Sequence, residues 1–192
     1  MQTIYPRTRR WTRAEYDRLI DKRVFHPDER LELLAGHLVV REPQGNPHAF
    51  AIELANEALR SAFGPEWRVR VLLPIALDEE SEPEPDVSVA PGPLRDSTEA
   101  KPSRLVLVVE VAESSLALDR EFKGSLYARA CVPEYWIVNL HGRVLEVHRE
   151  PGPDASALYG WAYRSAQSLS AEEHVSPLAA PANRVAVADL LP

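Results

Sequence analysis

The stretch Leu105-Val-Leu-Val-Val-Glu-Val111 decides the fold of this chain. All but one of its residues are aliphatic, and such a run without alternation is typical of a strand covered on both faces. The exception is Glu110. A buried carboxylate is costly unless a metal, a cation or a proton compensates its charge. The sequence therefore predicts either a charged site at the end of a central strand or a strand that frays there and lets Glu110 reach water.

A helix and a second strand follow this stretch. Helical spacing relates Leu118, Phe122, Leu126 and Ala130, which places a helix over about residues 116–130. The helix ends before Pro133, and Tyr135–Asn139 is another apolar run. Successive strands joined by a helix pair in parallel through a right-handed crossover. We therefore expect two adjacent parallel strands in the middle of the sheet.

Turn and capping signals divide the rest of the chain into short elements. We expect helices over residues 12–23 and 46–63, two strands around Ala35-Gly36 within residues 30–40, strands over residues 67–72, 86–90, 144–149 and 162–165, and a strand or helix over residues 185–191. No internal repeat or interdomain linker interrupts this pattern. The predicted fold class is α/β (mixed α+β): a single domain over residues 1–192, with a mixed β-sheet flanked by helices.

The composition is that of a globular protein, with 45% of the 192 residues hydrophobic and 27% charged. Cys131 is the only cysteine, so no disulfide can form within the chain, which suits a reducing cytoplasm. Residues 1–11 lack the apolar run of a secretory signal, and the apolar run 105–109 is too short to span a bilayer. We expect a soluble, cytoplasmic protein.

The net charge is −7, the wrong sign for a protein that binds nucleic acid by bulk electrostatics. The charge is unevenly distributed, because residues 1–30 hold eight Arg and Lys against five Asp and Glu. Residues 78–86 hold six carboxylates in nine positions. Such a run is usually a solvated loop. A phosphate that approached it would need screening cations, which is a reason to look for metal ligands there.

Asp86 follows Pro85 at the start of a predicted strand. Two adjacent strands that begin and end at one edge of the sheet would bring Asp86 close to Glu110. Paired carboxylates repel each other unless one is protonated or a divalent cation lies between them. A hard ion with oxygen ligands, such as Mg²⁺, suits such a pair. The alternative is that Asp86 is one more member of the acidic loop.

Three further residues are candidates for the same site. Lys123 lies four residues after Asp119, so it either forms a solvent-side pair with that residue or points back to the sheet edge. There it would help to deprotonate an attacking water and offset charge on a phosphate. Glu32 is either a third carboxylate or a surface residue of an edge strand. His48 is either a site residue or a plain polar residue in the first turn of its helix.

The motifs, taken in order, resemble a known family. The matching segments are Arg30–Val40, Pro47-His48, Glu84-Pro-Asp-Val-Ser-Val89, Leu105–Val111, Lys123 and Val132-Pro-Glu-Tyr-Trp-Ile-Val-Asn139. Together they resemble the Uma family of bacterial endonucleases, a restriction-endonuclease-like group of the PD-(D/E)xK nuclease superfamily. The resemblance runs from about Trp11 to the end of the chain.

The resemblance implies a restriction-endonuclease-like core and a set of catalytic positions. These positions are Asp86, Glu110, Lys123, Glu32 and His48. The lysine of the superfamily's E-x-K motif would stand at residue 112, where this chain has Ala112. Lys123 matches the position to which that lysine has migrated in the family. Asn139 stands where the family usually has an aspartate, and we expect it to act as a turn residue at the strand end.

The resulting hypothesis is an Mg²⁺- or Mn²⁺-dependent endonuclease that hydrolyses DNA. Asp86, Glu110 and the carbonyl of Val111 would hold the metal. Because the chain is acidic, a homodimer, another partner, or the patch of Arg7, Arg9, Arg10 and Arg13 would supply the contacts to phosphate.

Two alternatives stay open at this point. One is a retired nuclease fold that acts as a binding or regulatory module. The other is a metal-free hydrolase with two carboxylates, such as a glycosidase. The second needs a groove lined by aromatic residues, and only 7% of the residues are aromatic.

Overall fold

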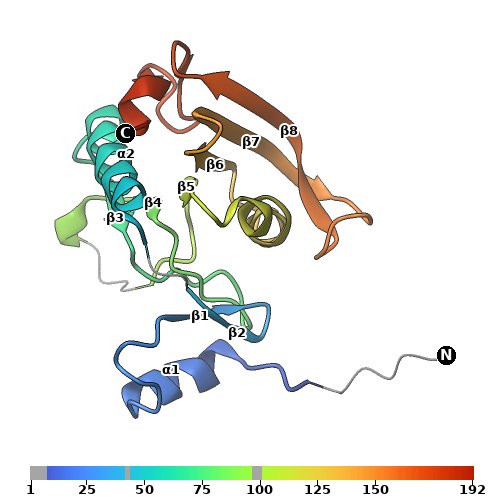
Figure 1. The fold of residues 1–192 in the computed structure, drawn as a ribbon. Coiled ribbons are helices and arrows are strands. Elements are labelled where there is room, and N and C mark those ends of the chain that lie inside the picture. Colours follow the sequence, from blue (N-terminus) through green and yellow to red (C-terminus); the bar gives the residue numbers. More distant parts are fainter. Residues whose placement is uncertain (1–7, 42–43, 97–100) are drawn as a thin grey trace.

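The structure, a computed structural model, describes residues 8–41, 44–96 and 101–192. Its centre is a six-stranded sheet with the strand order β3-β4-β5-β6-β7-β8. The strands are β3 (Trp67–Val71), β4 (Val87–Pro91), β5 (Leu107–Ala112), β6 (Glu134–Asn139), β7 (Val144–Pro153) and β8 (Trp161–Ser170). The last two are longer than the sequence predicts. Figure 1 shows the strands in this order, from β3 on the left to β8 on the right.

The decisive stretch forms β5, which lies between β4 and β6. It pairs in parallel with β6 and antiparallel with β4. The other neighbouring strands of the sheet are antiparallel. The parallel pair requires the chain to cross over the sheet between β5 and β6, and the crossover carries the helical segment that contains Lys123. The expected mixed sheet flanked by helices is confirmed.

The two faces of β5 belong to different cores. Val109 and Val111 pack with α2 (Asn46–Phe63), whereas Val108 and Ala112 pack on the side of the crossover helix, residues 118–129. Side chains alternate between the faces of a strand, so Glu110 faces the crossover helix, like Val108 and Ala112. Figure 1 shows α2 and the crossover helix on opposite sides of the sheet. The predicted end of the strand is thus covered on both faces.

The crossover helix is not regular. We predicted one helix over residues 116–130, but the structure has a π-helix, η2 (Leu118–Lys123), followed by α3 (Gly124–Arg129). The backbone N–H of Gly124 bonds to the carbonyl of Asp119, five residues earlier. Wide turns of this kind are frequent at functional sites. Their cause is not visible in the apolar spacing, which suits either helix type.

The N-terminal part forms a small lobe below the sheet (Figure 1). Its helix α1 (Arg13–Asp21) begins with the predicted capping box, in which Thr12 and Glu15 satisfy each other's backbone N–H. Strands β1 (Leu31–Leu34) and β2 (His37–Val40) form an antiparallel hairpin. Its two-residue turn needs positive φ at both positions, and Ala35 and Gly36 have φ of 47° and 79°.

The ends of α2 and of the chain complete the fold. The N-cap of α2 is Gly45, and Gly64 ends the helix at φ 72°. The C-terminal elements are β9 (His174–Val175), β10 (Val185–Ala186) and the 3₁₀-helix η3 (Val187–Leu190). Figure 1 shows this segment beside α2. No helix in the described ranges is long and apolar enough to cross a membrane.

Candidate active site

The structure brings all six predicted site residues to one pocket at the edge of the central sheet. Glu32, His48, Asp86, Glu110, Val111 and Lys123 line it. They come from β1, α2, the start of β4, β5 and the crossover helix, and the pocket volume is about 100 Å³. The structure thus shows that these side chains lie together, and their chemical roles stay a prediction.

The pairing of β4 with β5 places the two central carboxylates together. Val87 pairs with Val109 in an antiparallel register, so Asp86 lies opposite Glu110 where the two strands part. The backbone N–H of Val111 donates a 2.8 Å hydrogen bond to Oδ2 of Asp86. Since the N–H and C=O of one strand residue point to the same side, the carbonyl of Val111 also points toward Asp86.

Asp86 is surrounded by donors from the segment between β2 and α2. Oδ1 accepts from Arg41 at 3.2 Å and from the side-chain amide of Gln44 at 3.3 Å. Nε2 of His48, in the first turn of α2, lies 3.2 Å from Oδ2 but makes no hydrogen bond with it. Arg41 also donates to Glu84 at 3.0 Å. These contacts fix the carboxylate in one orientation before any ligand binds.

Lys123 lies between two carboxylates from different strands. Its Nζ is 3.1 Å from Oε1 of Glu110 and 3.3 Å from Oε1 of Glu32. The lysine is only 5% exposed, so the alternative of a solvent-side pair with Asp119 is wrong. Glu32 is buried as well, and its Oε2 accepts from the backbone N–H of Glu84. The surface alternative for Glu32 is therefore also wrong.

The charge state of Lys123 follows from its neighbours. Burial lowers its pKa, but attraction to Glu110, Glu32 and Asp119 outweighs burial and raises the pKa above its usual value. The side chain is therefore a fixed positive charge. Our expectation that it helps to deprotonate a water does not suit such an amine, whereas offsetting negative charge does.

Glu110 has the opposite tendency. Burial raises its pKa to about 8, against the effect of Lys123, and Asp86 and Asp119 raise it further. Its Oε1 also accepts a 2.6 Å hydrogen bond from the hydroxyl of Tyr127. The ammonium of Lys123 and the hydroxyl of Tyr127 therefore stabilise the charge that the sequence predicts at the end of this strand. Near neutral pH, the carboxyl group of Glu110 also binds a proton. The alternative of a frayed strand is wrong, since Glu110 is 2% exposed.

Asp119 is a fourth buried carboxylate of the pocket. Burial raises its pKa to about 6, although Lys123 and a hydrogen bond from Ser115 lower it. The hydroxyl of Ser115 lies 2.5 Å from its Oδ2. The backbone carbonyl of Asp119 accepts from Tyr135. Asp119 therefore adds negative charge to the pocket from the wide helical turn.

The acidic run before β4 is less solvated than its composition indicates. Glu82 is 2% exposed, and Lys101 contacts it at 2.7 Å. Asp78 pairs with Arg129 at 2.6 Å. Together with Asp86, these residues show that a dense acidic run can be folded inward when cations from distant segments meet it. The interpretation of the run as a solvated loop is wrong for Glu82 and Asp86, which are buried, whereas the side chain of Asp78 is 35% exposed.

The pocket suits a divalent cation by its charge and its donor chemistry. Its buried carboxylates are Glu32, Asp86, Glu110 and Asp119, and its cations are Lys123 and Arg41. The excess of negative charge and the oxygen ligands favour a hard ion. In the described part of the chain, no three His, Cys, Asp or Glu side chains are arranged to hold a metal together. Mg²⁺ does not need three, because it commonly keeps waters and binds one or two carboxylates plus substrate phosphate.

Sequence reasoning missed several residues of this site. Asp119 and Tyr127 lie four residues before and after Lys123, so their helical spacing could have placed all three on one face. Arg41 and Gln44 carry no such signal, because they approach Asp86 from more than 40 residues away. Asn139 behaves as the expected turn residue and accepts from the backbone N–H of Gly142 at 2.8 Å.

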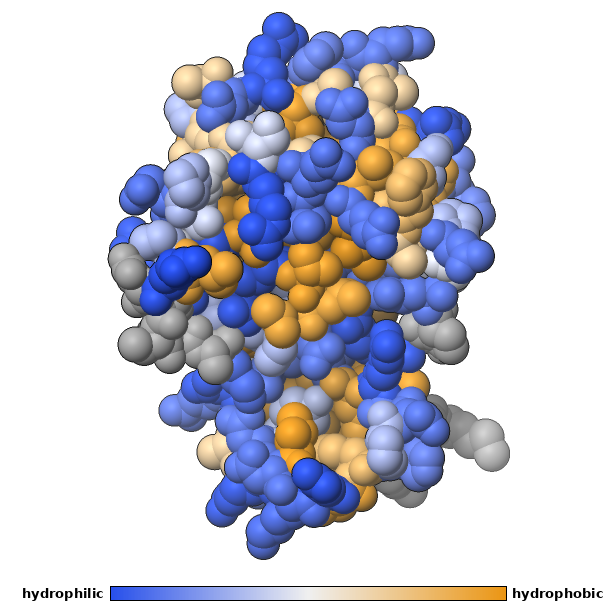
Figure 2. Space-filling view, turned by 90° about the vertical axis from the view of Figure 1, so that its left-hand side faces the viewer, coloured by the Kyte–Doolittle hydropathy of each residue, from blue (hydrophilic) through white to orange (hydrophobic). Residues whose placement is uncertain are grey.

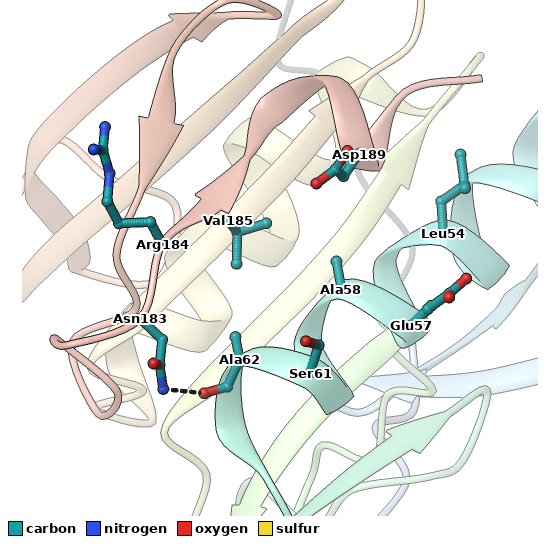
Figure 3. A pocket seen from close by; sticks show the side chains of 9 residues that line it. All are labelled: Leu54, Glu57, Ala58, Ser61, Ala62, Asn183, Arg184, Val185 and Asp189. Atoms are coloured by element: carbon teal, nitrogen blue, oxygen red, sulfur yellow. Dashed lines mark hydrogen bonds between the residues drawn. The ribbon is translucent and has the colours of Figure 1, made fainter.

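A second cavity lies on the other side of the sheet, between α2 and the C-terminal segment (Figure 3). Its volume is about 450 Å³, larger than that of the candidate site. Two carboxylates, Glu57 and Asp189, line it, and Asn183 donates to the carbonyl of Ala62 at 2.6 Å. No predicted site residue reaches this cavity, and neither carboxylate is buried. Its size alone does not make it the better candidate.

Comparisons with known proteins identify a family and a similar fold. The fold is similar to a crystal structure described as "a putative nuclease belonging to DUF820" from Anabaena variabilis ATCC 29413. The TM-score is 0.70 at 13% sequence identity, and the match covers 94% of this chain and 97% of the other. No curated protein matches this chain. The model of the Uma2 family, described as "Putative restriction endonuclease", matches residues 13–188. The resemblance noted in the sequence is confirmed: the chain belongs to the Uma2 family.

Proposed function

We propose that this chain is a metal-dependent endonuclease that hydrolyses phosphodiester bonds of DNA. The contact between Lys123 and Glu110 carries the proposal. A protonated lysine is buried 3.1 Å from the side chain of Glu110 and 3.3 Å from that of Glu32. A buried ion pair is weak evidence for a stabilising role, and clustered groups with shifted pKa favour a functional one.

The metal would be Mg²⁺ or Mn²⁺, held by Asp86, Glu110 and the carbonyl of Val111. When bound, such an ion activates a water and stabilises the scissile phosphate. The chain's own residues prepare the position. Arg41 orients Asp86, and Tyr127 orients Glu110. Both carboxylates are thereby held in place before substrate arrives, which lowers the reorganisation needed in the transition state.

Lys123 supplies a fixed positive charge beside the reacting phosphate in this proposal. Glu32 holds the ammonium from the side of β1 at 3.3 Å, and in the proposed site it also serves as a water-positioning group. His48 lies 3.2 Å from Asp86 and supports that carboxylate or contacts substrate. A homodimer and a cytoplasmic location remain part of the proposal.

The proposed arginine patch is only partly available for phosphate. Arg9 pairs with Glu15, and Arg10 pairs with Glu80 at 3.4 Å. Arg7 lies outside the described residues. These exposed ion pairs are weak, so each arginine can leave its glutamate and bind a phosphate instead.

A retired nuclease fold is the rival proposal. It is favoured by the donors that already surround Asp86 and by the small volume of the pocket, about 100 Å³. The glycosidase alternative loses support, because no Phe, Tyr or Trp of the described residues lines this pocket. The two remaining proposals differ in one measurable property, DNA cleavage.

Cleavage of supercoiled plasmid and of single-stranded DNA with Mn²⁺ tests the proposal. Glu110→Gln keeps the shape of the side chain and removes its charge. We expect it to lower the cleavage rate by about 100-fold or more. Asp189→Asn, which alters a carboxylate of the second cavity, should cleave like the wild type. Absence of cleavage by a folded wild type on all substrates would favour the retired fold.

A further inference from the structure

A groove of about 670 Å³ adjoins the candidate active site on the side of α1. Its apolar lining consists of Tyr16, Ile20, Phe25, Pro27, Leu31 and Leu72. Arg41 lines both this groove and the candidate site. Cavities of roughly 300–1,000 Å³ hold small organic ligands. Only the side chain of Arg41 would therefore separate a ligand in the groove from Asp86.

The groove has an aromatic wall. The rings of Tyr16 and Phe25 lie 6.0 Å apart at an angle of 45°. The hydroxyl of Tyr16 donates a 2.7 Å hydrogen bond to the carbonyl of Leu31, which fixes its ring. Phe25 is only half-buried, so part of its ring faces the groove. In Figure 2, hydrophobic surface is visible in the lower part of the molecule, where Figure 1 places α1.

The rim of the groove carries positive charge that the fold does not use. The side chains of Arg23 and Arg30 line the groove and are exposed. Within the described ranges, neither has a salt bridge or a side-chain hydrogen bond. Glu29 and Glu84 also line the groove, but Glu84 is occupied by Arg41 at 3.0 Å. Arg23 and Arg30 therefore outnumber the remaining carboxylate, Glu29, and the net positive charge favours an anion that also carries a flat apolar group.

We propose that this groove binds an unpaired nucleotide of the DNA substrate, next to the phosphate held in the candidate site. The base stacks on Phe25, and Arg23 and Arg30 contact the flanking phosphates. Aromatic rings beside cations are the usual means of binding single strands. A base within a duplex cannot enter such a groove without leaving its stack. The inference rests on the proposed function and makes the preferred substrate single-stranded DNA, a flap or a gap.

The acidity of the chain agrees with this inference. A net charge of −7 gives little general attraction to duplex DNA, whose binding depends on many phosphate contacts. Stacking does not depend on net charge, so one base in the groove can contribute where bulk electrostatics cannot. Two arginines then suffice to orient the strand.

Binding without metal tests the inference separately from cleavage. The probes are a fluorescein-labelled single-stranded 12-mer and its duplex, measured by anisotropy in EDTA. A second 12-mer with one 2-aminopurine reports stacking through quenched fluorescence. We expect the single strand to bind at least about tenfold more tightly than the duplex, with quenching. Phe25→Ala should weaken binding by roughly five- to a hundredfold and abolish the quenching, whereas Phe25→Trp should retain both.

Arg30→Gln should weaken binding and reduce the slope of log K against log salt by about 0.7. Leu158→Ala and Arg104→Gln are the matched controls, because both residues are exposed and neither lines the groove. They should bind like the wild type. Equal binding of Phe25→Ala and wild type, with both folded by circular dichroism, would overturn the inference. So would dimerisation that Phe25→Ala abolishes without changing DNA binding, because a second copy would then occupy the groove. If the protein binds single-stranded DNA through the groove but never cleaves DNA, the proposed function is rejected and this inference stands.

Discussion

The hydroxyl of Tyr127 donates a 2.6 Å hydrogen bond to Oε1 of Glu110, the same oxygen that Nζ of Lys123 approaches to 3.1 Å. Two donors from successive turns of the crossover helix thus hold one carboxylate oxygen of β5. Tyr127 is fully buried, so its hydroxyl cannot turn to water instead. The orientation of Glu110 is therefore a property of the fold and exists without a ligand.

Removing the hydroxyl tests this contact. Tyr127→Phe should lower the free energy of unfolding by about 1–3 kcal/mol, because a buried acceptor loses a donor. The loss should be larger at pH 9 than at pH 6, since the hydroxyl stabilises the charged form of Glu110. Urea unfolding at both values measures it. Tyr163→Phe, whose hydroxyl donates to the carbonyl of Val132, should lose a similar amount at both pH values; a loss for Tyr127→Phe that does not depend on pH would contradict the assignment.

The raised pKa of Glu110 predicts a pH dependence of stability. The pKa is about 8 in the folded protein, against a usual value of 4.5. Between these values the folded state holds a proton that the unfolded state has lost, so the free energy of unfolding falls as pH rises toward 8, and the contribution is lost above 8. The slope due to this group is at most about 1.4 kcal/mol per pH unit.

The comparison of wild type with Glu110→Gln isolates this effect. Asp119 has a pKa of about 6 and adds a similar contribution only below that value. Urea unfolding between pH 6 and 8, with a chelator present, should show a shallower decline for Glu110→Gln. Parallel curves for the two proteins would mean that Glu110 does not titrate in this range.

A divalent ion should stabilise the protein through the same carboxylates. A ligand that binds only the folded state adds RT ln(1 + [L]/Kd), about 2.7 kcal/mol at a hundredfold excess over Kd. Mn²⁺ should therefore raise the melting temperature of the wild type, and more at pH 8 than at pH 6, because the ion displaces the proton of Glu110. Asp86→Asn should respond less. Asp189→Asn, whose carboxylate lies in the other cavity, should respond like the wild type, and an equal response of all three would place the ion elsewhere.

Lys123 should matter for stability as well as for charge. Lys123→Met leaves two buried carboxylates without their cation, and breaking a buried ion pair costs about 3–5 kcal/mol. The same change in Arg129, which pairs with Asp78 at a half-exposed position, should cost at most about 1 kcal/mol. In a double-mutant cycle, Glu32→Gln should recover part of the loss caused by Lys123→Met. Independent, additive losses would remove Glu32 from the set of partners.

Local patterns predicted the parts of the fold that depend on neighbouring residues. The capping box of Thr12 and Glu15 placed α1, and the unbroken apolar run placed β5 between two other strands. The strand–helix–strand order then gave the parallel pair of β5 and β6. Each of these conclusions depended only on residues that are close together in the sequence.

The rest of the site could not be predicted in this way. Arg41 reaches Asp86 from 45 residues away, and Lys101 reaches Asp17 across 84. No periodicity links such pairs, because their approach depends on how separate elements pack. The same is true of Glu82, which composition assigns to solvent and packing buries. The sequence therefore identified several charged residues of the site, but it did not identify the residues that contact them.

The wide turn of η2 (Leu118–Lys123) makes the site sensitive to the length of the chain. In an α-helix, residues four apart drift by about 40° around the axis, so Asp119, Lys123 and Tyr127 would spread over about 80°. A π-helix holds one more residue per turn and reduces this drift. Deleting one exposed residue there, such as Glu121, would restore the tighter helix and turn Asp119 away from the other two. A relative could thus lose the geometry of this site through a single codon deletion while its sequence still displayed the counterparts of Asp86, Glu110, Asp119 and Lys123.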